Sequence, residues 1–377
     1  MKNQEWKEDG KSRVRSGPEE GRDNRENRNE ITRRTFLRKS LLAGAAAGAA
    51  ANGLFPFIQT IEVAFGAEAF SFAWISDSHL YPKTLNTRFV EKVERAVNEV
   101  KAMKPAPDFL IYGGDLAQLG DPVELDLGAE ILKALTVKKY YIPGEHDWYL
   151  DMGEKWMKLF GKPNWTFDHK GVRIIGLDTI SRGPDYWSAK KMSPQERMGH
   201  MATLDGSVAG TWAGVGKDQL DWMSKTLSDW PKDKPVIVFS HNPLYEYYPP
   251  WNFWVRDWRD VQAVLKPFSK VTNVHGHTHQ VLYNEIGSMR SIGMLATSWN
   301  WPYPPEGVPV LTTPMVRVDP GDHFDGVGWS KLAVTAADKV NNEYVMWRKD
   351  VFAQTQVDSG TGDNTNQILS PRIADRP

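Results

Sequence analysis

The chain has 377 residues, of which 41% are hydrophobic and 25% are charged, a balance typical of a globular protein with a full core. It contains no cysteine, which excludes disulfides, zinc–thiolate sites and thiol catalysis. Residues 1–40 carry 12 Lys and Arg against 8 Asp and Glu. Because the whole chain has a net charge of −1, the residues after 40 are slightly acidic, and no nucleic-acid polymer is expected as a partner.

The N-terminal segment, residues 1–67, is expected to be a targeting segment outside the folded domain. Residues 1–30 are polar and charged, which predicts disorder. Arg33 and Arg34 precede an uncharged, alanine-rich run at 41–51, and small residues follow it. This order resembles the bacterial twin-arginine signal peptide, which implies the twin-arginine export machinery as a partner, a periplasmic or secreted location, and no stable membrane span after cleavage. A chance arginine pair and an uncleaved anchor are the alternatives.

The body, residues 68–353, alternates apolar runs typical of strands with amphipathic runs typical of helices, the pattern of an α/β domain. After His279 the runs become shorter and β-like, which favours a second sheet formed late in the chain. Residues 354–377 are expected to be a flexible tail. The predicted strands are 70–75, 109–112, 139–142, 172–177, 236–239, 270–274, 280–286, 309–318 and 344–348, and the predicted helices are 87–103, 121–135 and 217–227.

Five short polar clusters each follow a strand-like run. In α/β sheets, binding sites form at the carboxyl ends of the strands, so the five clusters are expected to meet in one crevice. A single Asp-x-His or His-x-His is more often a surface turn, but five in this order indicate a site. The clusters are Asp77-Ser78-His79, Gly113-Gly114-Asp115, Gly144-Glu145-His146-Asp147, His241-Asn242-Pro243 and Gly276-His277-Thr278-His279.

The side chains in these clusters are ones that bind transition metals. Imidazole together with carboxylate suits zinc, iron or manganese better than calcium or magnesium. One zinc ion takes three or four ligands, and the clusters offer seven candidates, which favours two divalent or mixed-valence transition-metal ions that share a carboxylate. The seven candidates are Asp77, His79, Asp115, Glu145, His241, His277 and His279. Asp77 and His79 are two residues apart, as are His277 and His279, and in extended backbone each pair can hold one ion.

The series Asp-x-His, Gly-Asp, Gly-Asn-His-Asp/Glu, His and Gly-His-x-His resembles the signature of the calcineurin-like metallophosphoesterases. The resemblance implies an α/β fold with mixed sheets, in which a two-sheet β-sandwich core is flanked by helices. It also implies that His146 is the catalytic histidine. The ligands that it implies are Asp77, His79 and His279 for one metal ion, His241 and His277 for the other, and Asp115 as the bridge between them.

Two positions depart from patterns in this family. Glu145 stands where the family has Asn; it can still ligate the second metal ion, but it adds negative charge where an anionic phosphate must bind. Gln118, three residues beyond Asp115, replaces the metal-binding Tyr of purple acid phosphatases and the Asp of the Ser/Thr protein phosphatases. The chain therefore looks more like the exported bacterial members that include cyclic-nucleotide phosphodiesterases.

An aromatic-rich segment, 245–258, follows the His241 cluster and is expected near the mouth of the site. Its Tyr247, Trp251 and Trp254 could stack on a base, a sugar or an aromatic leaving group. The alternative, which we favour, is that these rings pack the loop onto the body.

These patterns together predict a metal-dependent phosphoesterase with a dinuclear centre and a small-molecule phosphoester substrate, with diesters slightly favoured over monoesters. His146 is expected to stabilise developing charge or to protonate the leaving oxygen. The alternative function is an exported metal-binding accessory protein on the same fold, with little turnover, for which Glu145 is the best support.

Overall fold

The structure is a computed structural model of the 377-residue chain. It describes residues 68–181, 193–196, 213–247, 253–301, 323–336, 338–347 and 352–353. The predicted targeting segment and the predicted tail lie outside these residues. Within the described part of the chain, no helix combines the length and the apolar character that crossing a membrane requires.

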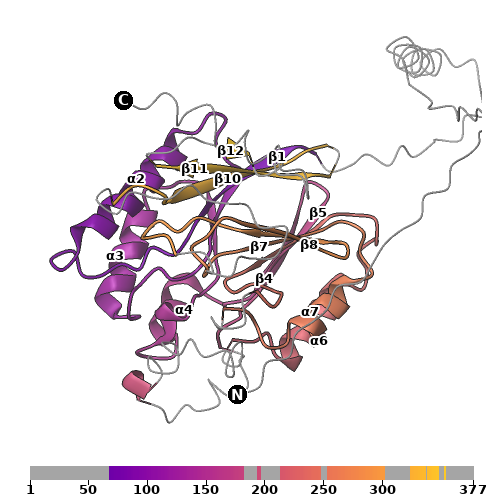
Figure 1. Ribbon diagram of the computed structural model, residues 1–377, viewed down its shortest axis with the longest axis horizontal. Helices are drawn as coiled ribbons and strands as arrows, with labels where there is room; N and C mark the ends of the chain where they lie inside the picture. Colours follow the sequence, from indigo (N-terminus) through magenta and orange to yellow (C-terminus); the bar gives the residue numbers. More distant parts are fainter. Residues whose placement is uncertain are drawn as a thin grey trace, which may run out of the picture. The chain divides into compact units, whose positions relative to one another are not determined.

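Two six-stranded mixed sheets form the centre of the domain (Figure 1). The first sheet has the strand order β12-β11-β10-β1-β2-β3, and the second has the order β4-β5-β6-β7-β9-β8. In the first sheet β1, β2 and β3 are parallel, and in the second β5, β6, β7 and β9 are parallel. The strands are β1 (Phe70–Ile75), β2 (Phe109–Tyr112), β3 (Lys138–Tyr141), β4 (Trp165–His169), β5 (Val172–Gly176), β6 (Val236–Ser240), β7 (Val271–His275), β8 (Leu282–Ile286), β9 (Met289–Gly293), β10 (Gly328–Val334), β11 (Val340–Met346) and β12 (Phe352–Ala353).

The two sheets share an apolar layer, and strand β1 shows how the sequence builds it. Side chains alternate across a strand, so Phe72 and Trp74 enter the cluster shared by the two sheets, whereas Ala73 and Ile75 enter the cluster that includes the helices. The Phe72 ring meets Phe239 of β6 edge to face, with ring centroids 5.5 Å apart. Burial on both faces explains why β1 has an almost continuous apolar sequence.

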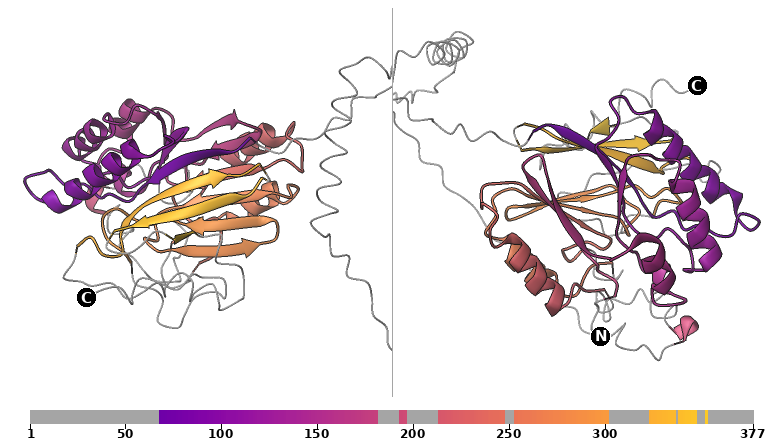
Figure 2. Two further views of the ribbon diagram at one scale, coloured as in Figure 1. Left: turned by 90° about the horizontal axis from the view of Figure 1, so that it is seen from above. Right: turned by 180° about the vertical axis from the view of Figure 1, so that it is seen from behind.

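Helices flank both sides of this core, as Figures 1 and 2 show, with α2, α3 and α4 on one flank and α6 and α7 on the other. Helix α2 begins where the Asn86 side chain accepts a hydrogen bond from the Arg88 amide, and α3 begins at a capping box formed by Asp121 and Glu124. The predicted two-sheet core flanked by helices is confirmed. The helices are α2 (Thr87–Ala102), α3 (Pro122–Leu132), α4 (Glu154–Phe160), α6 (Lys217–Leu227) and α7 (Trp258–Leu265), with a short 3-10 turn η1 (His146–Trp148).

The prediction of a separate sheet formed late in the chain is wrong. The second sheet already begins with β4 and β5, and the late strands β8 and β9 only extend it. Strands β10 and β11 instead join the first sheet, where β10 pairs antiparallel with β1. The reason is that β1 is buried, so its backbone N–H and C=O groups cannot bond to water and each of its two edges needs a neighbouring strand. The predicted strand 309–318 lies outside the described residues.

Candidate metal centre

The five polar clusters lie at the carboxyl ends of five parallel strands, as the sequence predicts. In the first sheet, β1, β2 and β3 lead into 77–79, 113–115 and 144–147. In the second sheet, β6 and β7 lead into His241 and 276–279. The loops of both sheets therefore contribute to one site, and its residues come from distant parts of the sequence.

The backbone of these loops is unusual, because several non-glycine residues adopt left-handed angles that most side chains disfavour. Backbone hydrogen bonds hold the first two loops in this shape: Asp77 N donates to Gly114 O at 2.9 Å, and His79 N donates to Asp115 O at 3.0 Å. Strained backbone of this kind concentrates at functional sites. Five predicted ligands have φ between 47° and 64°: Asp77, His79, Asp115, His277 and His279.

One group of possible ligands consists of Asp77, His79 and His279, all buried, with ligand atoms within 4.8 Å of one another. His279 Nε2 lies 3.4 Å from Asp77 Oδ1 and 3.1 Å from His79 Nε2. Burial, together with the neighbouring His146 and His279, holds the pKa of His79 well below its usual value. The neutral imidazole that results is the form that ligates metals.

The second group consists of Asp115, Glu145, His241 and His277. Glu145 Oε1 lies 2.8 Å from His277 Nδ1, and Glu145 Oε2 lies 3.0 Å from His241 Nε2. Burial opposes ionisation of Glu145, but His277 and His241 outweigh it and hold the pKa of the carboxyl well below its usual value. The side chain is therefore an anion. Although Glu145 Oε2 and His241 Nε2 lie close together, both are buried and neither makes a hydrogen bond. A bound metal ion fits as the missing partner of both atoms.

Asp115 lies between the two groups. Its Oδ2 is 3.2 Å from His241 Nε2 in the second group and 3.6 Å from His79 Nε2 in the first. Its other oxygen, Oδ1, accepts the His146 amide at 3.0 Å. One carboxylate that faces a histidine of each group has the position that a bridging ligand requires.

His277 and His279 belong to different ligand groups, although their spacing alone indicated that they could hold one ion together. His279 lies with the first group and His277 with the second. Extended backbone would place the two side chains on one side, but φ is +64° at His277 and +50° at His279, so the two side chains diverge. The assignment that the family resemblance implies places them in these two separate groups.

Main-chain carbonyls orient two of the histidines. His241 Nδ1 donates to Gly113 O at 2.8 Å, and His279 Nδ1 donates to Trp299 O at 2.8 Å. Because Nδ1 carries the proton in both rings, Nε2 keeps a lone pair directed at the site. The ring of Trp299 also covers the first group, with its centroid 4.2 Å from His79 and 4.8 Å from His279.

Gln118 orients two more histidines, a role that sequence reasoning missed. Its side-chain Oε1 accepts from His79 Nδ1 at 3.0 Å, and its main-chain carbonyl accepts from His146 Nδ1 at 2.7 Å. The His146 ring lies 4.4 Å from the His79 ring and is only partly buried. The sequence contained a signal for Gln118, namely its place three residues after Asp115.

Asp147 joins two of the loops beneath the site. Its carboxylate accepts backbone amides of Leu116 and Ala117 from the second loop and of Gly144 from the third. Burial, together with the nearby Asp115, raises its pKa to about 8. The side chain thus fixes the loop that carries His146.

The described parts of the aromatic segment pack against strand β8. Tyr245, Tyr247, Phe253 and Trp254 are buried in one cluster with Leu282, and the Tyr247 hydroxyl donates to Gln280 Oε1 at 2.7 Å. These four aromatic residues therefore pack onto the body of the domain. Substrate binding by Tyr247 and Trp254 stays a prediction, and Trp251 lies outside the described residues.

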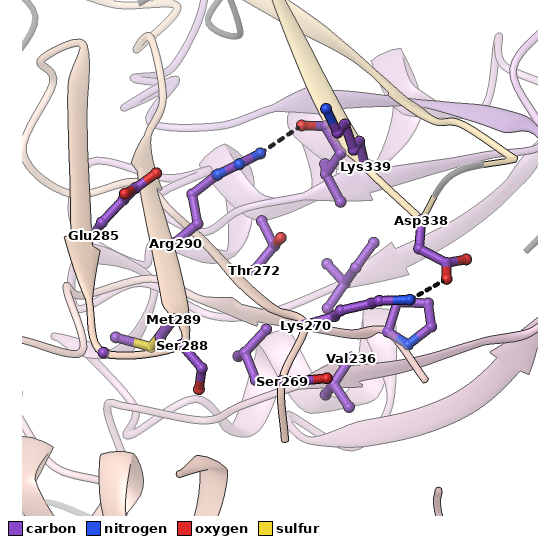
Figure 3. A pocket seen from close by; sticks show the side chains of 15 residues that line it. Val236, Ser269, Lys270, Thr272, Glu285, Ser288, Met289, Arg290, Asp338 and Lys339 are labelled. Atoms are coloured by element: carbon purple, nitrogen blue, oxygen red, sulfur yellow. Dashed lines mark hydrogen bonds and ion pairs between the residues drawn. The ribbon is translucent and has the colours of Figure 1, made fainter. Parts of the chain in front are cut away.

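A cavity of about 400 Å³ lies at the other end of the second sheet, where β6 and β7 begin and β10 turns into β11 (Figure 3). Lys270 pairs with Asp338 across it at 2.6 Å, and Arg290 donates to the Val340 carbonyl at 3.3 Å. None of its lining residues is a histidine, and none belongs to the two ligand groups. This cavity is separate from the candidate metal centre.

Known proteins resemble this chain over more than half of its length. A probable glycerophosphodiester phosphodiesterase GpdQ from Arcobacter nitrofigilis is 26% identical over 60% of this chain and 73% of its own length. The 3',5'-cyclic-nucleotide phosphodiesterase alr5338 from Nostoc sp. is 22% identical over 61% of this chain and 79% of its own. Among solved structures, a dimetal phosphatase from Danio rerio superposes with a TM-score of 0.52 at 17% identity, covering 75% of this chain and 98% of that one, which is a likeness of fold alone.

The family match covers the part of the chain that carries the site. Residues 70–281 match the family described as calcineurin-like phosphoesterase, and this range contains all five polar clusters. It also spans the parallel strands from which those clusters extend. The chain belongs to the calcineurin-like phosphoesterase family.

Proposed function

We propose that the protein hydrolyses phosphate diesters at a dinuclear metal centre. The observation that carries the proposal is the position of Asp115, whose Oδ2 faces a histidine of each ligand group. In this proposal Asp77, His79 and His279 hold one transition-metal ion, Glu145, His241 and His277 hold the other, and Asp115 bridges them. Manganese, iron and zinc all suit such a mixture of imidazole and carboxylate ligands.

The residues around the centre have separate tasks. Two ions bound there would supply Lewis acidity to the phosphoryl group and activate a water molecule for in-line attack. His146 has its Nδ1 proton held by the Gln118 carbonyl, so its Nε2 is the atom left to exchange a proton with the substrate. In the proposed reaction this nitrogen stabilises developing charge or protonates the leaving oxygen.

Glu145 favours a diester over a monoester as the substrate. Its carboxylate is ionised and adds a negative charge to the second ligand group, where the family has a neutral amide. A dianionic monoester is repelled by this charge more than a monoanionic diester is. Two relatives, a probable glycerophosphodiester phosphodiesterase and a cyclic-nucleotide phosphodiesterase, are named for diester substrates, which also supports a diester.

The test combines metal analysis with matched substrates. After reconstitution with Mn²⁺ the protein should bind two ions per chain and hydrolyse an aryl phosphodiester. In Glu145→Asn, we expect the ratio of kcat/KM for the monoester to kcat/KM for the diester to rise by about tenfold, since one buried charge is removed. A ratio that does not move would mean that Glu145 acts only as a ligand.

The accessory-protein alternative makes a different prediction in the same experiment. It expects two bound ions with no hydrolysis of any ester in a broad panel, in the wild type and in Glu145→Asn alike. Turnover that is lost in His146→Ala, with both ions still bound, would contradict that alternative.

Export through the twin-arginine route is part of the proposal. It rests on the Arg33-Arg34 pair, the uncharged run at 41–51 and the small residues after it. The proposed location is periplasmic or secreted, and the domain proposed to act there comprises residues 68–353.

A further inference from the structure

We infer that Gln118 is a positioning residue that acts on the first ligand group and on His146 through two different atoms. Its side chain sets the metal affinity of the group formed by Asp77, His79 and His279, and its main-chain carbonyl sets the orientation of His146. The part that concerns His146 rests on the function proposed above, whereas the part that concerns metal affinity does not.

The main chain at Gln118 is held firmly beside the first loop. Gln118 N donates to Leu80 O at 2.9 Å, Leu80 N donates to Leu116 O at 2.8 Å, and Leu80 forms a parallel bridge with Ala117. Leu80 follows His79 directly in the sequence. The two loops are thus joined immediately next to the histidine that Gln118 contacts, so the residue can impose a fixed geometry on it.

The side chain acts on His79. Gln118 Oε1 accepts the Nδ1 proton of His79 at 3.0 Å, which leaves the Nε2 lone pair directed at the first group. His241 and His279 receive the same support from main-chain carbonyls, which no substitution at the supporting residue removes. A substitution at Gln118 can therefore remove the hydrogen bond to His79, and its loss should weaken metal binding by the first ligand group alone. Outer partners of ligating histidines typically account for 10- to 100-fold in metal affinity.

The main-chain carbonyl acts on His146 independently of the side chain. It accepts from His146 Nδ1 at 2.7 Å and remains in place whatever side chain residue 118 carries. A substitution at 118 should therefore change metal affinity and leave proton transfer by His146 intact. A residue with a merely structural role would not produce this separation.

The experiment compares three variants with the wild type by titration with Mn²⁺. Gln118→Leu has a similar size and no acceptor, and it should weaken one of the two binding steps by about 10- to 100-fold while the other stays near the wild-type value. Gln118→Glu keeps an acceptor for His79 Nδ1 and should restore that step to the wild-type affinity or a tighter one. Thr166→Val is the matched control. It removes the hydrogen bond from the Thr166 side chain, on the edge strand β4, to Ile174 O of β5, and it should leave both binding steps unchanged.

The second measurement uses aryl diesters with leaving groups of graded acidity at saturating Mn²⁺. Gln118→Leu should show the wild-type dependence of kcat on the leaving group, whereas His146→Ala should show a steeper one. Unchanged Mn²⁺ affinities in Gln118→Leu, or failure of Gln118→Glu to restore them, would overturn the role of the side chain. A steeper dependence in Gln118→Leu would overturn the separation of the two atoms. Absence of turnover in the wild type would count against the proposed function, with the Mn²⁺ titration still deciding the role of the side chain.

Discussion

Gly144 determines how closely the third loop approaches the carboxylate that joins the two ligand groups. A Cβ atom at this position would lie 2.0 Å from Asp115 Oδ1 and 2.5 Å from Asp115 N. These contacts are impossible without a shift, and the Asp115 side chain is the group displaced. Because Asp115 faces both groups, Gly144→Ala should weaken both Mn²⁺-binding steps, each by about tenfold or more.

The control for this prediction is Gly287→Ala. Gly287 has φ of +62°, and an added Cβ meets no atom within 4 Å, so the substitution should lower the free energy of unfolding by about 1 kcal/mol through backbone strain alone. It should bind Mn²⁺ like the wild type. Two ions bound at wild-type affinity in Gly144→Ala would show that the loop can move away without cost to the site.

At the level of single residues, the sequence could predict which side chains meet but not how each is held. The motif spacing and the strand ends brought the seven candidate ligands and His146 together, because strand ends of parallel sheets converge. The partners of the histidine Nδ1 atoms could not be predicted in this way. The carbonyls of Gly113 and Trp299 carry no side-chain signal, and the contact of Gln118 with His79 depends on how two loops pair.

One carboxylate of helix α2 adds hydrogen bonds to the apolar packing that holds this helix against the first sheet. Glu99 Oε2 accepts the indole N–H groups of Trp329 at 2.7 Å and Trp347 at 2.9 Å, and both tryptophans are buried. Glu99→Ala leaves two buried donors unpaired, so we expect the free energy of unfolding to fall by about 2 kcal/mol or more.

Urea denaturation of this variant checks the effect. Glu99→Gln keeps one acceptor and should lose less stability than Glu99→Ala, and neither variant should change Mn²⁺ affinity, since Glu99 belongs to neither ligand group. Equal midpoints for Glu99→Ala and the wild type would contradict the proposed attachment.

At the level of elements, local patterns predicted several strands, missed others such as β4, β9 and β10, and did not predict how the late strands pair. The ranges 70–75 and 109–112 were predicted to the residue because each is a short apolar run bounded by polar residues. The sheet to which each late strand belongs is set by long-range contacts, such as that of Phe70 with Val334, which no local periodicity reports. For this reason the late strands were predicted to form a sheet of their own, and β10, which was not predicted as a strand, joins the first sheet instead.

The proposed export of the whole chain rests on the N-terminal segment. If the twin-arginine route is used, Arg33-Arg34→Lys-Lys should leave the protein in the cytoplasm, because the arginine pair is the feature that this route recognises. Cell fractionation followed by immunodetection measures the outcome. Unchanged export of the lysine variant would exclude this route for the protein, and unaltered Mn²⁺ binding by the retained protein would show that the domain itself is intact.

Strand β1, which leads directly into Asp77 and His79, lies between β2 and β10. One of these neighbours follows it closely in the sequence, whereas the other, Gly328–Val334, comes from near the end of the domain. On the ribosome, every candidate ligand has therefore emerged while one side of β1 is still open. The sheet that supports the centre can close only after β10 has emerged. We therefore expect stable metal binding only after β10 has paired with β1, and a chain exported before that pairing would have to acquire its metals outside the cytoplasm.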